Sequence, residues 1–206
     1  MSKIFNKSGE TLLEVLIALT IVTVAAAAAG SAIMAAVQGL SLSKNYLIAQ
    51  NLADEGLEAV KNIRDTNWMK YTINKSTCWL VIGDTTNLEG KDCKTAKSFE
   101  YTPSLPGEST RNDYKLSFSN GRWNATVQTS DIDTDINLYK LGLKDGKYQN
   151  DESGAPVFYR AIRVSDPIDA GEGNIDSITI ESIVKWYEGS KLFWISGKEI
   201  LTNYLQ

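Results

Sequence analysis

Residues 15–43 contain no charged side chain, and a single acidic residue, Glu14, stands directly before this run. About 20 consecutive apolar residues are enough to cross a bilayer as an α-helix. The run therefore predicts a membrane-spanning helix near the N-terminus. A charged side chain at the edge of such a helix costs a few kcal/mol unless it finds a partner, so Glu14 needs a functional explanation.

The segment before the helix is short and basic, with Lys3 and Lys7 among residues 1–9. Positive charge at this end predicts a cytoplasmic N-terminus and a C-terminal domain outside the cell membrane. A secretory signal peptide has an apolar core of about 7–15 residues, followed by small residues at its cleavage site. Here the apolar run is longer and the small residues precede it. The pattern predicts a single-pass membrane protein, and a plain signal anchor would share it.

Composition narrows the possible functions. The chain has 206 residues, a formal net charge of −4 and no histidine. This length leaves room for a membrane segment and one domain of ordinary size. The lack of histidine excludes Ser-His-Asp and Cys-His nucleophilic sites and most catalytic zinc sites. For this reason we do not expect an enzyme. Nothing in the charge distribution suggests a nucleic-acid-binding surface, so we expect no direct nucleic-acid partner.

The segment KSGETLLEVLIA at residues 7–18 resembles the processing site of type IV prepilins and pseudopilins. The resemblance implies that a prepilin peptidase cuts after Gly9 and that Glu10 becomes the N-terminal residue, which is usually methylated in that family. Glu14 then matches the glutamate at the fifth mature position. The family most often has Phe where this chain has Glu10.

This resemblance gives Glu14 a role in assembly. The new amino group of one subunit can pair with the Glu14 carboxylate of another, while Leu12, Leu13 and Leu16 pack in the filament core. An unpaired carboxylate in an apolar surrounding is unfavourable, so the pair would set register more than it would add stability. The alternative is an interfacial glutamate that reaches water.

Residues 49–68 are also similar to a stretch in minor pilins of the PilV type. The resemblance implies a minor pilin of a type IV pilus-like filament, found in the cell membrane and then in an extracellular or periplasmic filament. Its implied partners are prepilin peptidase, other pilin subunits and an inner-membrane assembly platform. Two alternatives remain open: a pseudopilin of a type II secretion system, and a membrane-anchored surface binding protein that does not polymerise.

The fold expected from the sequence is α+β, with a long N-terminal helix packed on a C-terminal antiparallel sheet. One helix over about residues 11–64 would be about 80 Å long. Its second half is amphipathic, with an apolar stripe at Leu42, Tyr46, Ala49, Ala53, Gly56, Val60 and Ile63. The predicted parts are a leader at 1–9, a membrane or filament-core half at 10–42, an amphipathic half at 43–68 and a β-rich outer domain at 69–206.

Alternating apolar residues and turn signals predict the strands of the outer domain. Hairpins are expected around Asn120-Gly121, Asp145-Gly146 and Glu188-Gly189. Residues 91–112 and 165–174 are expected to be loops. The predicted strands are 77–82, 114–118, 122–128, 138–143, 147–148, 158–164, 178–187 and 191–196, with a last apolar stretch at 200–205.

Two cysteines, Cys78 and Cys93, would close a short loop if they pair outside the cytoplasm, which stabilises the fold by about 3 kcal/mol in the chain-entropy model. Free thiols are the alternative. Four tryptophans at strand positions are expected to pack in the core or across strands rather than to form a sugar-binding platform. They are Trp79, Trp123, Trp186 and Trp194.

No cofactor is expected, although calcium is a weak candidate at two acidic segments. Asp131, Asp133 and Asp135 are spaced like the start of an EF-hand loop. The positions that would need Gly and Glu hold Ile136 and Gly142, so an EF-hand is excluded. Some secretion pseudopilins bind calcium in a loop before the last strands, and the matching acidic residues here are Asp166, Asp169, Glu172 and Asp176. Solvated acidic loops are the favoured interpretation of both.

Overall fold

The structure is a computed structural model that describes residues 8–71, 75–82, 93, 98–99, 112–144, 146–150, 158–171 and 174–203. Within these ranges, the side chains of residues 8–10, 166–171 and 174 are outside the description. The chain divides into two compact units, Met1–Tyr46 (unit 1) and Leu47–Gln206 (unit 2).

One long helix, α1 (Ser8–Lys70), forms the described part of unit 1 and continues into unit 2. It confirms the predicted N-terminal helix, although it ends at Lys70 rather than near residue 64. The hydroxyl groups of Thr20, Thr23 and Ser31 donate hydrogen bonds to carbonyl oxygens three residues earlier, at 2.7, 2.9 and 2.8 Å. These polar side chains can therefore lie in lipid without an unpaired donor.

The described strands all belong to unit 2 and form one seven-stranded sheet with antiparallel pairings. The central strand β5 pairs with β6 along one edge and with β1 and β3 along the other. This arrangement confirms the α+β class. The strands are β1 (Asp113–Ser119), β2 (Arg122–Val127), β3 (Lys140–Lys144), β4 (Lys147–Gln149), β5 (Phe158–Gly171), β6 (Asn174–Glu188) and β7 (Lys191–Thr202).

The predicted hairpins are present. β1 pairs with β2 around Asn120 and Gly121, whose φ values are 52° and 73°. A two-residue hairpin turn of this kind needs positive φ at both positions, which Asn and Gly adopt most easily. The hairpins β3–β4 and β6–β7 also form where the sequence places them.

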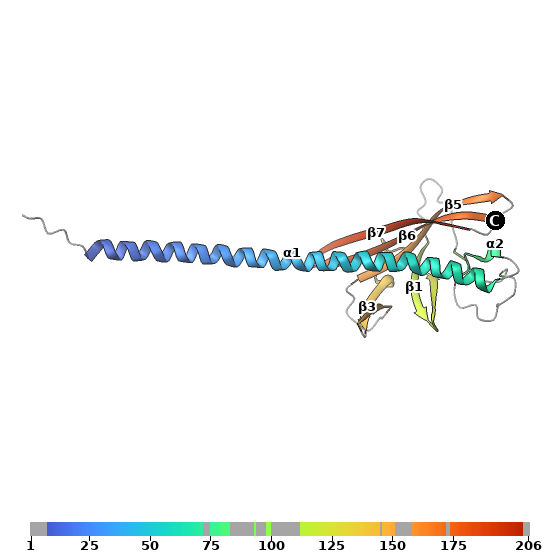
Figure 1. Ribbon diagram of the computed structural model, residues 1–206, viewed down its shortest axis with the longest axis horizontal. Helices are drawn as coiled ribbons and strands as arrows, with labels where there is room; N and C mark the ends of the chain where they lie inside the picture. Colours follow the sequence, from blue (N-terminus) through green and yellow to red (C-terminus); the bar gives the residue numbers. More distant parts are fainter. Residues whose placement is uncertain are drawn as a thin grey trace, which may run out of the picture. The chain divides into compact units, whose positions relative to one another are not determined.

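The second half of α1 lies across one face of the sheet, with β5, β6 and β7 to one side of it and β1 and β3 to the other (Figure 1). The predicted stripe is buried from Ala49 onward, at Ala49, Ala53, Val60 and Ile63. Leu42 and Tyr46, which belong to unit 1, are 40% and 51% exposed. The stripe therefore packs on the sheet only within unit 2.

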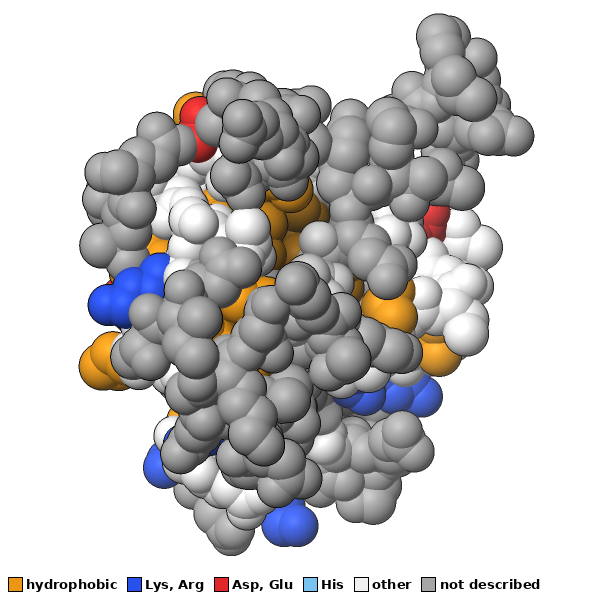
Figure 2. Space-filling view, turned by 90° about the vertical axis from the view of Figure 1, so that its right-hand side faces the viewer, with side chains coloured by type: hydrophobic (Ala, Val, Ile, Leu, Met, Phe, Trp, Pro, Cys, Tyr) orange, Lys and Arg blue, Asp and Glu red, His pale blue; other side chains and the backbone are white. Residues whose placement is uncertain are grey.

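The opposite face of the sheet is covered by the segment that leads into β3. Ile132 and Tyr139, the latter in the short 3-10 helix η2 (Ile136–Tyr139), pack against Tyr159, Ala161 and Ile183. Figure 2 shows one face of the chain, with hydrophobic side chains visible near the centre and Lys and Arg side chains toward the edge.

Two sequence predictions of local structure are wrong. Residues 77–82 are not a strand: α2 (Lys75–Cys78) is followed by a turn and a single bridge between Val81 and Ser98. These residues are apolar because they are buried, since Trp79, Leu80 and Ile82 all lie in the core. They do not form the hydrogen-bonded pairing of a β-strand.

Residues 165–174 are not a loop, because β5 and β6 run through most of them with register shifts at Ser165/Ile168, Ile168/Asp169 and Asp169/Gly171. Pro167 cannot donate to a ladder, and such irregularities accommodate it. The predicted loop at 91–112 lies mostly outside the described residues.

The tryptophan prediction holds in part. Trp79 and Trp186 are 1% exposed and lie in the core, as expected. Trp123 is half-buried and makes a T-shaped ring contact with Phe118. Trp194 is 65% exposed and lies on β7 opposite Lys185 of β6, so of the two expected placements the core is excluded for it.

Candidate functional site

The residues expected to act in processing and assembly lie at the start of α1. Gly9 and Glu10 belong to its first turn, where side chains are outside the description. Leu12, Leu13 and Leu16 are 65%, 61% and 53% exposed, and Glu14 is exposed beside them. Nothing in the described part of the chain tests their predicted roles, which stay predictions.

Helix geometry separates the acidic group from two of the leucines. Successive helical residues are about 100° apart around the axis. Leu12 and Leu16 therefore share one face, and Glu14 lies about 160° from both. Leu13 lies between the two directions. Only neighbours on more than one side of α1 can contact all four residues at once.

The large exposed hydrophobic side chains of unit 1 extend from Leu12 to Leu42 and Tyr46, and Leu47 continues them at the start of unit 2. Among the described residues, α1 is the helix long and apolar enough to cross a membrane, with a window of mean hydropathy 2.4 that is 0% buried. A water-exposed surface of this extent is strongly unfavourable, so it needs lipid or other subunits around it.

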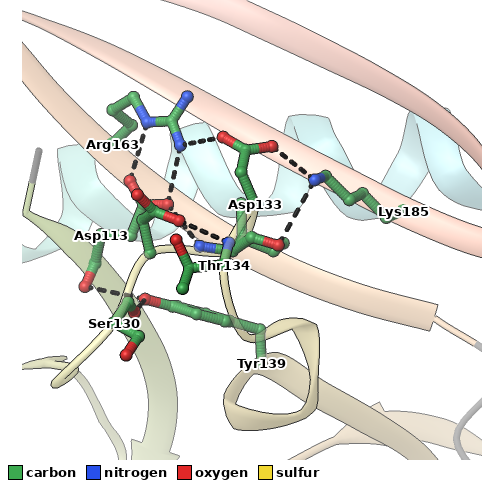
Figure 3. Close-up of polar contacts among 9 residues, drawn as sticks. Asp113, Ser130, Asp133, Thr134, Tyr139, Arg163 and Lys185 are labelled. Atoms are coloured by element: carbon green, nitrogen blue, oxygen red, sulfur yellow. Dashed lines mark hydrogen bonds and ion pairs between the residues drawn. The ribbon is translucent and has the colours of Figure 1, made fainter. Parts of the chain in front are cut away.

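Unit 2 contains a cluster of charged side chains between the sheet and the segment 128–139 that covers it (Figure 3). Arg163 donates from Nε and Nη2 to the two carboxylate oxygens of Asp113, at 2.8 and 2.9 Å. Its Nη2 also reaches Asp133, at 2.8 Å, and Lys185 donates to Asp133 at 2.6 Å. Two acids and two bases thus compensate one another on the face of the sheet opposite α1.

Further bonds attach the covering segment to this cluster. The backbone N–H of Ile132 donates to the Asp113 carboxylate at 2.9 Å. The hydroxyl of Tyr139 lies 3.3 Å from the backbone carbonyl oxygen of Asp113 and, within the segment, 2.6 Å from that of Ser130. The hydrogen bond from Lys185 holds the pKa of Asp133 below its usual value, against the opposing effect of burial. The charged cluster therefore fixes the segment 128–139 on the sheet.

Sequence reasoning did not single out Asp113, Arg163 or Lys185. A signal was present in β5, where Arg160 and Arg163 interrupt the apolar sequence FYRAIRV of residues 158–164. A charge inside a buried strand needs a partner, and the partner of Arg163 comes from β1, fifty residues earlier in the chain.

The acidic triplet considered for calcium is bonded within the protein. Asp131 accepts from the N–H of Thr134 at 2.6 Å, Asp135 accepts from the N–H of Asn137 at 3.0 Å, and Asp133 joins the charged cluster. In the described part of the chain, no three metal-ligating side chains converge. Calcium here stays an untested prediction.

The second calcium candidate falls largely outside the description. Glu172 and the side chains of Asp166 and Asp169 are not described. Asp176 is described, and its backbone carbonyl accepts from the N–H of Asn203 at 2.7 Å. Calcium at this place also remains untested.

The predicted disulfide is confirmed. Cys78 and Cys93 are bonded, with Cα atoms 5.7 Å apart, and among the described residues there is no free cysteine. Cys78 is fully buried with Tyr71 and Val81, close to the end of α1. The bond therefore joins α2 to the segment around Cys93.

Comparison with known proteins bears on the N-terminus. A family described as the prokaryotic N-terminal methylation motif matches residues 4–30, which include Gly9, Glu10 and Glu14. No curated protein and no solved structure matches the chain. The motif is that of structural subunits rather than enzymes, and with the exposed apolar helix it supports a membrane-anchored, type IV pilin-like or pseudopilin subunit.

Proposed function

We propose that this chain is a minor pilin, a structural subunit of a type IV pilus-like filament. Prepilin peptidase cuts after Gly9, Glu10 is methylated, and the subunit waits in the membrane with its C-terminal domain outside. An inner-membrane assembly platform then moves it into the filament. The observation that carries this proposal is the exposed apolar surface of unit 1, which begins at Leu12 within the matched N-terminal methylation motif and extends beyond it.

In the proposed filament, α1 exchanges lipid for the helices of other subunits. This exchange gains little hydrophobic energy, since lipid tails are as apolar as leucine. A polar contact must therefore define the position of each subunit. The amino group of Glu10 and the carboxylate of a neighbour's Glu14 supply it, and a wrong register leaves a charge unpaired in an apolar surrounding.

The experiment replaces Glu14 with Gln in the native cell and compares membrane and sheared-filament fractions. We expect unchanged membrane levels and at least about a tenfold loss from filaments, because one unpaired charge outweighs 1.4 kcal/mol. Glu58→Gln is the matched control: it makes the same change on the same helix, at a carboxylate whose side chain is 71% exposed.

Mass spectrometry of the same membranes reports the N-terminus. The proposal expects wild-type chains and both variants to lack residues 1–9, with one added methyl group on Glu10. Chains that keep Met1 in cells with active peptidase would contradict the processing step. Equal incorporation of the Glu14 and Glu58 variants would contradict the role of the carboxylate in assembly.

A further inference from the structure

Unit 2 contains a groove of about 870 Å³ between α1 and the hairpins β1–β2 and β3–β4. This volume lies within the range of small-molecule binding sites, about 300–1,000 Å³. Leu52, Leu116 and Leu141 lie at its base and are almost fully buried. The groove is thus a concave surface with an apolar base, separate from the apolar surface of unit 1.

A buried arginine contributes to the lining of this groove. Arg160 projects from β5, and its side chain is 3% exposed. Nη1 donates to the carbonyl of Leu52 at 3.2 Å and lies 3.5 Å from a carboxylate oxygen of Glu55. Its guanidinium carbon also lies 5.8 Å from the ring centroid of Trp123. Among the described residues, Nε and Nη2 have no hydrogen-bond partner.

Arg163, three residues later, makes its hydrogen bonds through the Nε–Nη2 edge of the guanidinium group, which is the edge that the described residues leave free in Arg160. In Arg163, Nε and Nη2 together hold both oxygens of Asp113. This parallel pair of bonds is the preferred geometry between a guanidinium and a carboxylate. The bonds of Arg160 within the described chain are made by Nη1, so its Nε–Nη2 edge can donate the same pair of hydrogen bonds to a carboxylate in the groove.

The charges around the groove agree with an anionic ligand. The charged residues that line it are Arg160, Lys147 and Glu55, two bases and one acid, in a chain whose formal net charge is −4. Glu55 lies on the Nη1 side of Arg160, so it does not occupy the Nε–Nη2 edge. An incoming carboxylate would meet a net positive site.

The rim supplies ring faces and hydrogen-bond acceptors. Trp123 and Tyr148 are half-buried aromatic walls. The amide nitrogens of Gln149 and Asn150 already donate to the carbonyls of Lys144 and Leu116. Their amide oxygens therefore remain as acceptors for hydroxyl groups. Stacking faces beside acceptors suit a sugar ring, which has apolar C–H faces and many hydroxyl donors.

We propose that this groove binds an acidic saccharide, with the Nε–Nη2 edge of Arg160 holding the carboxylate of a uronic acid and Trp123 and Tyr148 lying against the sugar rings. This site does not depend on filament assembly, and a monomer in detergent would have it. Sequence reasoning expected Trp123 to pack in the core or across strands and favoured no sugar-binding platform. The proposal differs because it rests on the groove and on Arg160, which the sequence does not bring together.

The test uses the full-length chain in a detergent without sugar groups, titrated by calorimetry with trigalacturonic acid and with its neutral methyl ester. Lys147→Gln removes the rim charge, and Lys144→Gln is its matched control, because the two lysines face each other across the same hairpin and Lys144 does not line the groove. Arg160→Gln removes the proposed carboxylate contact, and circular dichroism reports whether this variant folds.

We expect saturable binding of the acid at millimolar concentration or below, and at least tenfold weaker binding of the ester. Lys147→Gln should weaken binding up to about fivefold, and more at low salt, while Lys144→Gln leaves it unchanged. Folded Arg160→Gln should bind at least tenfold more weakly. If that variant does not fold, the proposal is tested by the comparison of Lys147→Gln with Lys144→Gln and by the comparison of the acid with its ester.

The proposal is overturned by equal binding of acid and ester, by equal effects of the two lysine variants, or by no saturable binding of the acid. A short peptide with a free C-terminal carboxylate serves as a further probe. If it binds and trigalacturonic acid does not, the groove recognises a peptide and the saccharide assignment is wrong.

Discussion

Replacing Gly56 with Ala should destabilise unit 2, although alanine is the better helix former. A Cβ at Gly56 would lie 2.3 Å from Ser182 Oγ, 3.1 Å from Ile162 Cδ1 and 3.2 Å from Ser182 Cβ. α1 can approach the sheet this closely only because position 56 has no side chain. Ala would gain about 1 kcal/mol of helix propensity and lose about 1–3 kcal/mol through overpacking. A contact of 2.3 Å favours the upper part of that range, so the expected net loss is about 1–2 kcal/mol.

Ser182 offers a direct check of this cause. It is fully buried, and its Oγ has no hydrogen-bond partner in the described part of the chain. Ser182→Ala removes both the orphan hydroxyl and the closest contact, so alone it should be neutral or stabilising by up to about 1 kcal/mol. With Gly56→Ala it should restore about 1 kcal/mol, because the nearest atoms would then be 3.1 and 3.2 Å away.

Urea unfolding of the full-length chain in detergent measures these differences, with tryptophan fluorescence as the signal because Trp79 and Trp186 are buried. Gly39→Ala is the matched control on the same helix, since a Cβ there meets nothing within 4 Å. It should cause no loss of stability. A Gly56→Ala variant that unfolds at higher urea than wild type, or a double variant without recovery, would refute the steric argument.

Two further predictions concern the charged cluster and the disulfide. Asp133→Asn should reduce the free energy of unfolding near neutral pH, because Lys185 and Arg163 lose a carboxylate. The pKa of Asp133 is lowered from its ordinary value of 3.8 by folding, so its contribution is present above that value and is lost as the pH falls through the lower folded pKa. Urea unfolding at a series of pH values should show the variant and wild type converging in acid, and a pH-independent difference would contradict this role. Replacing Cys78 and Cys93 with Ala should cost about 3 kcal/mol and should make stability insensitive to reducing agent; wild type unaffected by the same reductant would show that the bond adds nothing.

Local patterns in the sequence predicted the elements that depend on neighbouring residues. The helix follows from residues 15–43 and the buried stripe, and the hairpin turns follow from pairs such as Asn120-Gly121. The strand predicted at residues 77–82 was wrong because a run of apolar residues indicates burial, and a turn packed in the core is buried as well. The register shifts of β5 near Pro167 depend on pairing with β6, so composition alone suggested a loop.

The partners of the buried charged groups could not be predicted from the sequence. Arg160 and Arg163 look alike in the sequence, and strand alternation places them on opposite faces of the sheet. Arg163 forms its ion pairs with Asp113 and Asp133. These residues are far from it in the sequence, so the sequence alone does not predict the contact. The structure was needed to distinguish an arginine that attaches a covering segment from one that retains free donors beside a groove.

The division of α1 explains why changes in its two halves should have separable effects. The described core of unit 2 takes its helical residues from Ala49 onward, at Ala49, Leu52, Ala53, Ala59, Val60 and Ile63. The large apolar side chains from Leu12 to Tyr46 take no part in that core. Their sequence is therefore not constrained by the folding of unit 2, and it can be set by lipid and by neighbouring subunits. A loss of filament incorporation on changing Glu14 would accordingly report assembly, whereas a change at Gly56 acts on the stability of the domain that the proposed filament would display.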